Sequence, residues 1–337
     1  MKLIECVPNF SEGVDTNIIR QIADEIDSVN GVKLLNIDPG KGANRTVITF
    51  AGEPDPVIDA AFLAIKKAGE LIDMSSHKGE HPRIGATDVC PLVPIANITM
   101  EETVRYAAQL AKRVGEELRI PVYLYEHAQP DKTRHNLSMI RVGQYEGFFE
   151  KIKLPAWQPD FGPTVFDAKR GATVIGVRDF LIAYNVNLDT TSVAKANEIA
   201  GRVRETGRKT LRDRKITTTP GSLRSVKAIG WYIKEYGFAQ VSMNLTNIDI
   251  TPLHIAFEEA RFEAEKLGLR VTGSELIGLI PLKAMLAAGE YFRKKNHQPV
   301  EANELELVQT AVNELGLSQL SPFNPHERII EYLLRDL

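Results

Sequence analysis

Two strand-like runs flank a turn in VKLLNIDPGKGANRTVITF, residues Val32–Phe50, and this pattern indicates the fold. The runs combine apolar and β-branched side chains, and Pro39–Ala43 between them holds the proline and glycines typical of a turn. Apolar residues at helical spacing precede the pair at 15–26, and a helix that opens on Pro54 follows it to about Leu71. A strand pair between two helices is the centre of a split β-α-β-β-α-β unit.

The elements on either side complete one such unit and then repeat its order. We therefore predict an α/β (α+β) fold of two ferredoxin-like βαββαβ subdomains, residues 1–178 and 179–337, with outer helices and a ligand cleft between them. The supporting pattern consists of strands at 3–7, 89–95, 122–125, 181–188, 226–234, 239–245 and 271–277, and of helices at 100–118, 192–204, 252–267, 281–294, 303–314 and 325–334.

A segment rich in proline and aromatic residues, Leu154–Gly171, joins the two halves. Apolar rings in a stiff loop suggest a wall for a flat ligand at the domain junction, where pockets tend to form. A loop that packs on its own domain is the alternative interpretation.

Composition narrows the class of protein. Of the 337 residues, 43% are apolar and 25% charged, which is typical of a globular chain. The formal net charge of −3 argues against nucleic-acid and anionic-membrane partners. We find no signal peptide and no apolar run near the ~20 residues that a membrane span needs. Cys6 and Cys90 lie in apolar runs, so we expect buried thiols and a cytoplasmic location.

The run His77-Lys78-Gly79-Glu80-His81-Pro82-Arg83-Ile84-Gly85 concentrates polar side chains before a strand. It contains the His-x-x-Glu-His pattern of inverted zinc proteases, which works only on a helix. Gly79 disfavours a helix here, and Pro82 pushes His81 into an extended conformation. We therefore favour a metal-free acid/base site over a zinc site, with a solvated surface turn as the plain alternative.

Several longer runs share a family resemblance that covers nearly the whole chain. Together with the histidine run, they resemble the glutamate formimidoyltransferases, the formiminotransferase half of formiminotransferase–cyclodeaminases. The matching runs are Glu5–Gly13, Asn44–Val47, Glu80–Arg83, Asp88–Pro91, Pro121–Tyr125, Asp160–Pro163, Ala228–Tyr232, Pro281–Ala284 and Glu327–Leu333.

The resemblance implies transfer of the formimino group from N-formimino-L-glutamate to N5 of tetrahydrofolate, with release of glutamate, in histidine degradation. It implies tetrahydrofolate as co-substrate, no metal, and a homodimer. It also implies that His81 is catalytic and that Asp38 accompanies it. No deaminase activity is expected, because the chain ends where a cyclodeaminase domain would begin. The stretch that resembles the folate-binding segment is Gly162, Pro163, Thr164, Val165, Phe166, Asp167, Ala168, Lys169, Arg170 and Gly171.

This chemistry suits a histidine and an anion. Attack by a folate amine on an amidinium carbon requires one proton removed and one delivered, which a single imidazole such as His81 can do in sequence. Asp38 can hold the amidinium or orient His81, although an aspartate before Pro39-Gly40 also initiates turns. Glu80 is a candidate second base.

Both substrates carry carboxylates, which planar cations bind well. We expect Arg45 and Arg83 to lie near the reacting carbon, and Lys169 and Arg170 to meet the folate tail. The basic segment 208–224 is expected to be a mobile loop, with attraction of polyglutamylated folate as one role for it.

Three other functions stay open on the sequence alone. They are folate-dependent formyl transfer between 5-formyltetrahydrofolate and glutamate, a zinc hydrolase, and a non-catalytic folate-binding protein.

Overall fold

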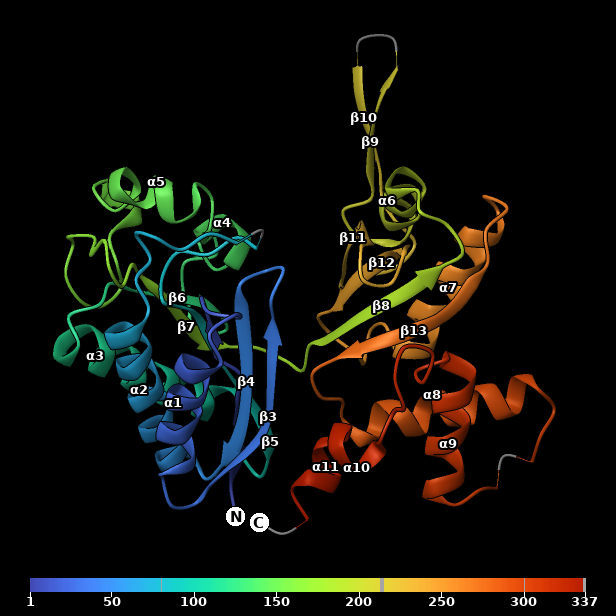
Figure 1. Ribbon diagram of the computed structural model, residues 1–337, viewed down its shortest axis with the longest axis horizontal. Helices are drawn as coiled ribbons and strands as arrows, with labels where there is room; N and C mark the ends of the chain where they lie inside the picture. The colour runs from blue at the N-terminus through green and yellow to red at the C-terminus, as the bar shows by residue number, and fades with distance from the viewer. Residues whose placement is uncertain (80, 213–214, 300, 336–337) are drawn as a thin grey trace. The chain divides into compact units, whose positions relative to one another are not determined.

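The computed structural model describes residues 1–79, 81–212, 215–299 and 301–335. The chain divides into two compact units, and the division falls between Asp179 and Phe180 (Figure 1). The ligand cleft expected between the two halves stays a prediction.

Unit 1 contains a seven-stranded sheet. The strands β3, β4, β1 and β5 lie in this order and pair antiparallel, which is the ferredoxin-like arrangement. Beyond β5, the strands β7 and β6 extend the sheet in parallel. The elements are β1 (Leu3–Cys6), β2 (Asn9–Phe10), α1 (Thr16–Asp27), β3 (Val32–Gly40), β4 (Arg45–Gly52), α2 (Pro54–Leu71), β5 (Thr87–Ala96), α3 (Met100–Glu117), β6 (Val122–Glu126), α4 (Leu137–Ile140), α5 (Gln144–Lys151), the 3₁₀ turn η1 (Pro155–Trp157) and β7 (Thr173–Val177).

Helices α1, α2 and α3 cover one face of this sheet (Figure 1). Helix α1 starts where Asp15 accepts hydrogen bonds from two backbone N–H groups, and it buries a stripe of apolar residues at three- and four-residue spacing. The core beneath the helices includes Cys6 and Cys90, which are buried free thiols, as expected, with sulfurs 3.5 Å apart. On the other face, Ile140 of α4 and Phe148 of α5 pack over β6 and β7 in a second, smaller cluster.

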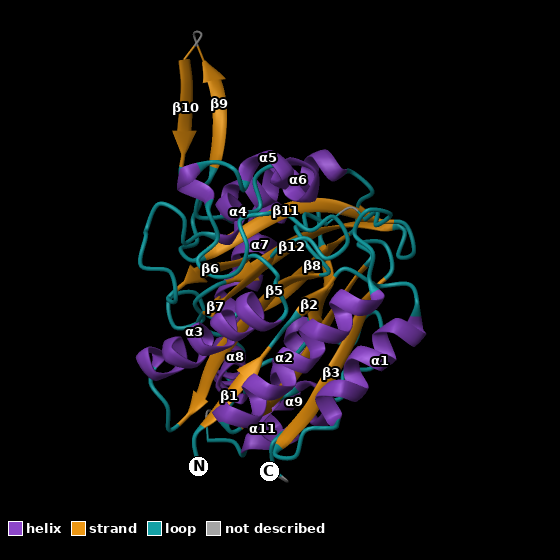
Figure 2. Ribbon diagram, turned by 90° about the vertical axis from the view of Figure 1, so that its left-hand side faces the viewer, coloured by secondary structure: helices purple, strands orange, loops and turns teal. Residues whose placement is uncertain are grey.

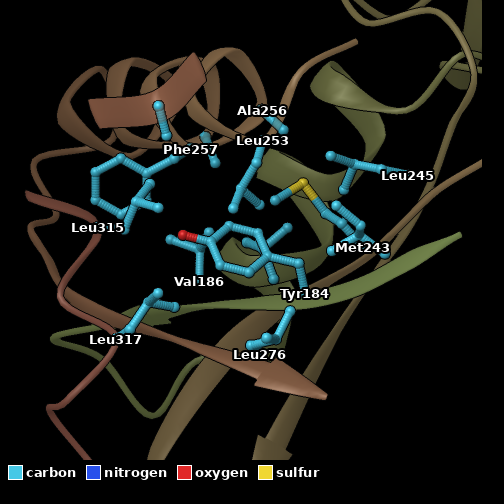
Figure 3. Close-up of a cluster of buried hydrophobic side chains, with 14 of the residues drawn as sticks. Tyr184, Val186, Met243, Leu245, Leu253, Ala256, Phe257, Leu276, Leu315 and Leu317 are labelled. Carbon is cyan, nitrogen blue, oxygen red and sulfur yellow. The ribbon is translucent and has the colours of Figure 1, made fainter. Parts of the chain in front are cut away.

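Unit 2 contains a four-stranded sheet in the order β11-β12-β8-β13, again ferredoxin-like. Its core lies between this sheet and the helices, with Tyr184 of β8, Met243 of β12 and Phe257 of α7 at its centre (Figure 3). The predicted fold class of both halves is therefore confirmed. The elements are β8 (Ile182–Leu188), α6 (Val193–Val203), β9 (Arg208–Arg212), β10 (Lys215–Thr219), β11 (Val226–Ile233), β12 (Phe238–Leu245), α7 (Leu253–Glu265), β13 (Val271–Ile277), α8 (Leu282–Lys295), α9 (Glu304–Leu315), α10 (Pro325–Arg328) and α11 (Ile330–Leu333).

The expectation of a mobile basic loop at 208–224 is wrong for most of its length. Strands β9 and β10 form an antiparallel hairpin with Thr219 opposite Arg208, and it extends away from the rest of unit 2 (Figure 2). The run Ile216-Thr217-Thr218-Thr219 is β-branched throughout, which favours a strand. Residues 213–214, part of the basic run, lie outside the described residues.

In the parts of the chain that the structure describes, no helix is long and apolar enough to cross a membrane.

The capping box of α3 gives a test of the fold. Thr99 accepts from the backbone N–H of Glu102, whose carboxylate accepts from the backbone N–H of Thr99 in return. We expect Thr99→Ala to lower the free energy of unfolding by roughly 0.5–2 kcal/mol, as measured by urea denaturation. Thr99→Ser keeps the hydroxyl and should stay near wild type. Equal stability of Thr99→Ala and wild type would contradict the role of this cap.

Candidate active site

The residues of the histidine run before Glu80 are bonded to the turn between β3 and β4. Nε2 of His77 lies 3.0 Å from the carbonyl oxygen of Asn44, and Nδ1 of His77 accepts from Nε of Arg83 at 3.3 Å. The Asn44 amide in turn donates to the carbonyl of Lys78 at 2.9 Å. Both ring nitrogens of His77 therefore have partners within the protein, so this ring fixes the run rather than reacting.

The described part of the run, 77–79 and 81–83, forms no helix. The zinc-protease interpretation requires a helix, so its geometric condition is not met where the chain is described. Among the described residues, no group of three His, Cys, Asp or Glu side chains could hold a metal ion. Glu80, the candidate second base, lies outside the described residues.

His81 is partly buried and neutral at pH 7. Its Nδ1–H donates to the carbonyl of Pro82 at 2.7 Å, which leaves Nε2 as the basic nitrogen. Burial, followed by the charges of Arg45 and Arg141, lowers the pKa of His81 from 6.5 to about 4. Among the described residues Nε2 has no hydrogen-bond partner, so the neutral imidazole is ready to accept a proton there.

The charges around His81 meet at Asp88, whose side chain is fully buried. Its carboxylate accepts from Nη1 of Arg45 at 2.5 Å, from Nη2 of Arg141, and from the backbone N–H of Ile84 at 3.0 Å. Burial raises the pKa of Asp88, but the charges of Arg141 and Arg45 outweigh it, so this pKa lies below its usual value. Burial also lowers the pKa of Arg45 to about 10, which still leaves it protonated at neutral pH.

Arg141 was not foreseen from the sequence. It lies at the end of α4, where the ammonium of Lys151 donates to the carbonyls of Met139, Ile140 and Val142 at 2.9, 2.7 and 3.1 Å. The same ammonium lies 3.8 Å from the centre of the Trp157 ring. Lys151 thus holds the turn that carries Arg141 to Asp88. The sequence did contain a signal for Asp88, since it is a single carboxylate within the apolar strand that follows the histidine run. A buried charge needs partners, so such a residue is expected to bind cations. The sequence contains no comparable signal for Arg141.

Arg83 has partners of its own. Its guanidinium binds Glu146 of α5 through two hydrogen bonds of 2.9 and 2.6 Å, and its carbonyl accepts from the backbone N–H of Tyr145 at 2.8 Å. The structure therefore brings Arg45 beside His81 but uses Arg83 to join the run to α5. A role for Arg83 in binding a substrate carboxylate stays a prediction.

Asp38 lies at the same end of the sheet as the arginine cluster. It is half-buried in β3 opposite Val47 of β4, and Val47 is also opposite Asn9 of β2. Asn9 accepts from Nε of Arg45 at 3.0 Å. Since neighbouring strands lie ~4.8 Å apart, Asp38 and Asn9 are separated by about two strand spacings.

The segment 162–171 lies along the residues that follow His81. The carbonyl of Arg170 accepts from the backbone N–H of Ala86 at 2.8 Å, and Gly171 adopts φ +71° with its α-carbon against the carbonyl of Ile84. Phe166 packs edge-on to Phe149 at 4.7 Å, so this ring, like Trp157, packs within unit 1. For these two rings the structure supports the alternative of a loop packed on its own domain.

The charged residues of this segment cap helices. Nζ of Lys169 donates to the carbonyl of Glu70 at the end of α2, and Arg170 donates to the carbonyl of Leu118 after α3 and to Asp167, at 2.7, 2.6 and 2.6 Å. Val165 in this segment is 73% exposed. Binding of folate by these residues stays a prediction.

The glycine next to Glu80 provides a test of the local packing. A Cβ on Gly79 would lie 2.3 Å from the carbonyl oxygen of Ala43, whereas a Cβ on Gly42 meets nothing within 4 Å. We expect Gly79→Ala to cost about 1–3 kcal/mol of stability in thermal or urea unfolding, and Gly42→Ala to cost far less. Equal effects of the two substitutions would refute the close approach.

The electrostatics of His81 provide a second test. Histidine NMR over pH 3–8 should place the midpoint of His81 near 4, well below the 6.5 of an ordinary histidine. Arg141→Gln removes one of the two positive charges and should raise the midpoint. Because the folded-state pKa lies below the unfolded value, the stabilising contribution of the neutral ring is complete above pH ~6.5 and is lost as the pH falls toward 4. A midpoint near 6.5 in the wild-type protein would rule out this environment.

Comparisons with known proteins agree with this picture. The family model for the "Formiminotransferase domain, N-terminal subdomain" matches residues 3–178, and that for the "Formiminotransferase domain" matches residues 183–335. A "Formimidoyltransferase-cyclodeaminase" from Gallus gallus is 50% identical over 99% of this chain and 60% of its own length. The chain thus spans about three fifths of that relative.

Two shorter relatives match over nearly their whole length. A "Glutamate formimidoyltransferase" from Thermoplasma acidophilum is 45% identical over 88% of this chain and 94% of its own. Another of the same name, from Streptococcus pyogenes serotype M1, is 42% identical over 86% and 93%. The chain therefore belongs to the formiminotransferase family.

Proposed function

We propose that this protein is a glutamate formimidoyltransferase that moves the formimino group from N-formimino-L-glutamate to N5 of tetrahydrofolate, releasing L-glutamate. The observation that carries the proposal is the match to two glutamate formimidoyltransferases over 93–94% of their length. A neutral, partly buried histidine beside two arginines supports it. Tetrahydrofolate acts as co-substrate, and the transfer chemistry itself calls for proton movement rather than a metal.

His81 would serve as the base and then as the acid. As N5 attacks the amidinium carbon and the new C–N bond forms, Nε2 of His81 accepts the proton that N5 loses. The imidazolium then donates this proton to the glutamate nitrogen as the old C–N bond breaks. A pKa near 4 keeps the ring neutral at pH 7, so Nε2 is available to accept this proton.

The first step would benefit from a stronger base than the free protein provides, because an imidazole whose pKa lies near 4 binds a proton weakly. The same two arginines that lower the pKa of His81 would attract the carboxylates of the donor. An anion beside them offsets their charge and raises the pKa of His81. Binding of the donor would therefore make the ring a better base for the first step, and the imidazolium formed there is still acidic enough to donate its proton to the glutamate nitrogen.

The other predicted residues enter the proposal around this centre. Asp38, at the same end of the sheet, would hold the amidinium or orient the ring. The segment 162–171 would contact the folate, with Lys169 and Arg170 toward a polyglutamate tail. We also propose that the protein is a cytoplasmic homodimer, which light scattering and cell fractionation would test.

The direct test is the removal of the imidazole. We expect His81→Ala to lower kcat by roughly 10²–10⁴-fold, while the Kd for tetrahydrofolate changes little. His135→Ala, which alters an exposed histidine, serves as the matched control. Formation of 5-formiminotetrahydrofolate is followed with N-formimino-L-glutamate as donor. Turnover at the wild-type rate in His81→Ala would end the assignment, and turnover with only N-formyl-L-glutamate or 5-formyltetrahydrofolate would favour formyl transfer instead.

The pH dependence offers a separate test. The acid limb of kcat/KM reports the base of the free enzyme. Because the pKa of His81 is lowered to about 4, activity should persist well below pH 6 and fall only as the pH approaches that value. An acid limb centred near 6.5 would show that an ordinary, solvated histidine is the base.

A further inference from the structure

The arginine pair beside His81 has more charge than the protein around it neutralises. Arg45 and Arg141 share one carboxylate, that of Asp88, and their side chains are only 10% and 14% exposed. Within the described residues, the cluster of two guanidinium groups, one carboxylate and one neutral imidazole thus has a net charge of +1. Cations held out of water attract an anion strongly.

Both guanidinium groups also keep donors available. Arg45 uses Nε for Asn9 and Nη1 for Asp88, while Arg141 uses Nε and Nη2 for Asp88. In the described chain, Nη2 of Arg45 and Nη1 of Arg141 have no protein acceptor. Asp88 therefore fixes the orientation of both guanidinium planes. One Nη group on each guanidinium remains available as a donor, and two such donors can bind a planar carboxylate.

The chemistry of the donor indicates which carboxylate this is. In N-formimino-L-glutamate, the leaving nitrogen and the α-carboxylate are bonded to the same carbon, whereas the γ-carboxylate lies two methylenes further away. A group that protonates this nitrogen must therefore lie close to a group that binds the α-carboxylate. His81 and the arginine pair have this proximity, because the backbone N–H of Ile84, three residues after His81, donates to the same Asp88 carboxylate that both arginines bind.

We propose that Arg141, together with Arg45, binds the α-carboxylate of the amino-acid donor, and that Asp88 is the positioning residue that aims both guanidinium groups. The inference rests on the proposed function and adds to it a selectivity among formimino donors. The enzyme selects formimino groups carried by α-amino acids and rejects those on amines that lack a carboxylate at that carbon.

Two donors and three variants test the proposal by kinetics. N-formimino-L-glutamate has both carboxylates, and N-formimino-4-aminobutyrate lacks only the α-carboxylate. Arg141→Gln should raise KM for the first donor by roughly 30–100-fold, leave KM for tetrahydrofolate unchanged, and change the already poor use of the second donor by less than about twofold. Arg141→Lys keeps the charge and should recover part of the loss. Arg113→Gln, at a surface pair with Asp59, is the matched control.

Equal losses with both donors would show that Arg141 has a structural role only and would overturn the proposal, as would no loss with either. Asp88→Asn should reproduce the selective rise in KM for N-formimino-L-glutamate, provided that circular dichroism shows a folded protein. If this variant does not fold, the Arg141 pair of variants decides alone.

Binding measurements separate this inference from the proposed function. N-acetyl-L-glutamate and 4-acetamidobutanoate mimic the two donors without reacting. By calorimetry, the wild-type protein should bind the first more tightly, and Arg141→Gln should weaken the first by at least about tenfold while leaving the second unchanged. Absence of wild-type transfer with this binding pattern intact would refute only the function. Equal affinity of the wild-type protein for both mimics would overturn the α-carboxylate site.

Discussion

The candidate site depends on one buried carboxylate. Asp88 receives a guanidinium from β4, a second from the end of α4, and a backbone N–H from the histidine run. A strand, a helix and a loop that are far apart in sequence are thereby held at one point. Removing this carboxylate would leave two nearly buried positive charges facing each other, which is costly. The Asp88 carboxylate therefore sets the position of the two arginines. Their charges in turn lower the pKa of His81.

A second set of contacts holds the segments around Asp88 in place without touching His81. Lys151 holds the end of α4 through three carbonyls, Arg83 joins the histidine run to α5, and His77 joins it to the turn after β3. Each is a charged or titratable side chain whose hydrogen-bonding capacity is largely used inside the protein. This explains why, among the described residues of a run so rich in polar side chains, mainly His81 is left for proton transfer.

Much of the fold could be predicted from the sequence, because the apolar spacing of the long helices and strands is regular. The prediction missed β2, β7, β9, β10 and α4, because elements of two to five residues carry too little periodicity to identify, and it also missed the eight-residue helix α5. For the site, the sequence pointed to His81 through the histidine run and to Arg45 as a cation for the substrate carboxylates. It gave no sign of Arg141, which is 53 residues from Asp88 and meets it only through tertiary packing.

The hairpin of β9 and β10 pairs with itself and forms a separate two-stranded sheet. Among the described strands, the four-stranded sheet of unit 2 keeps all its ladder bonds without it. The insertion between α6 and β11 is therefore a place where chain length can vary during evolution at little expense to the core. An epitope tag or a fluorescent reporter grafted at this position would leave the architecture of the unit in place.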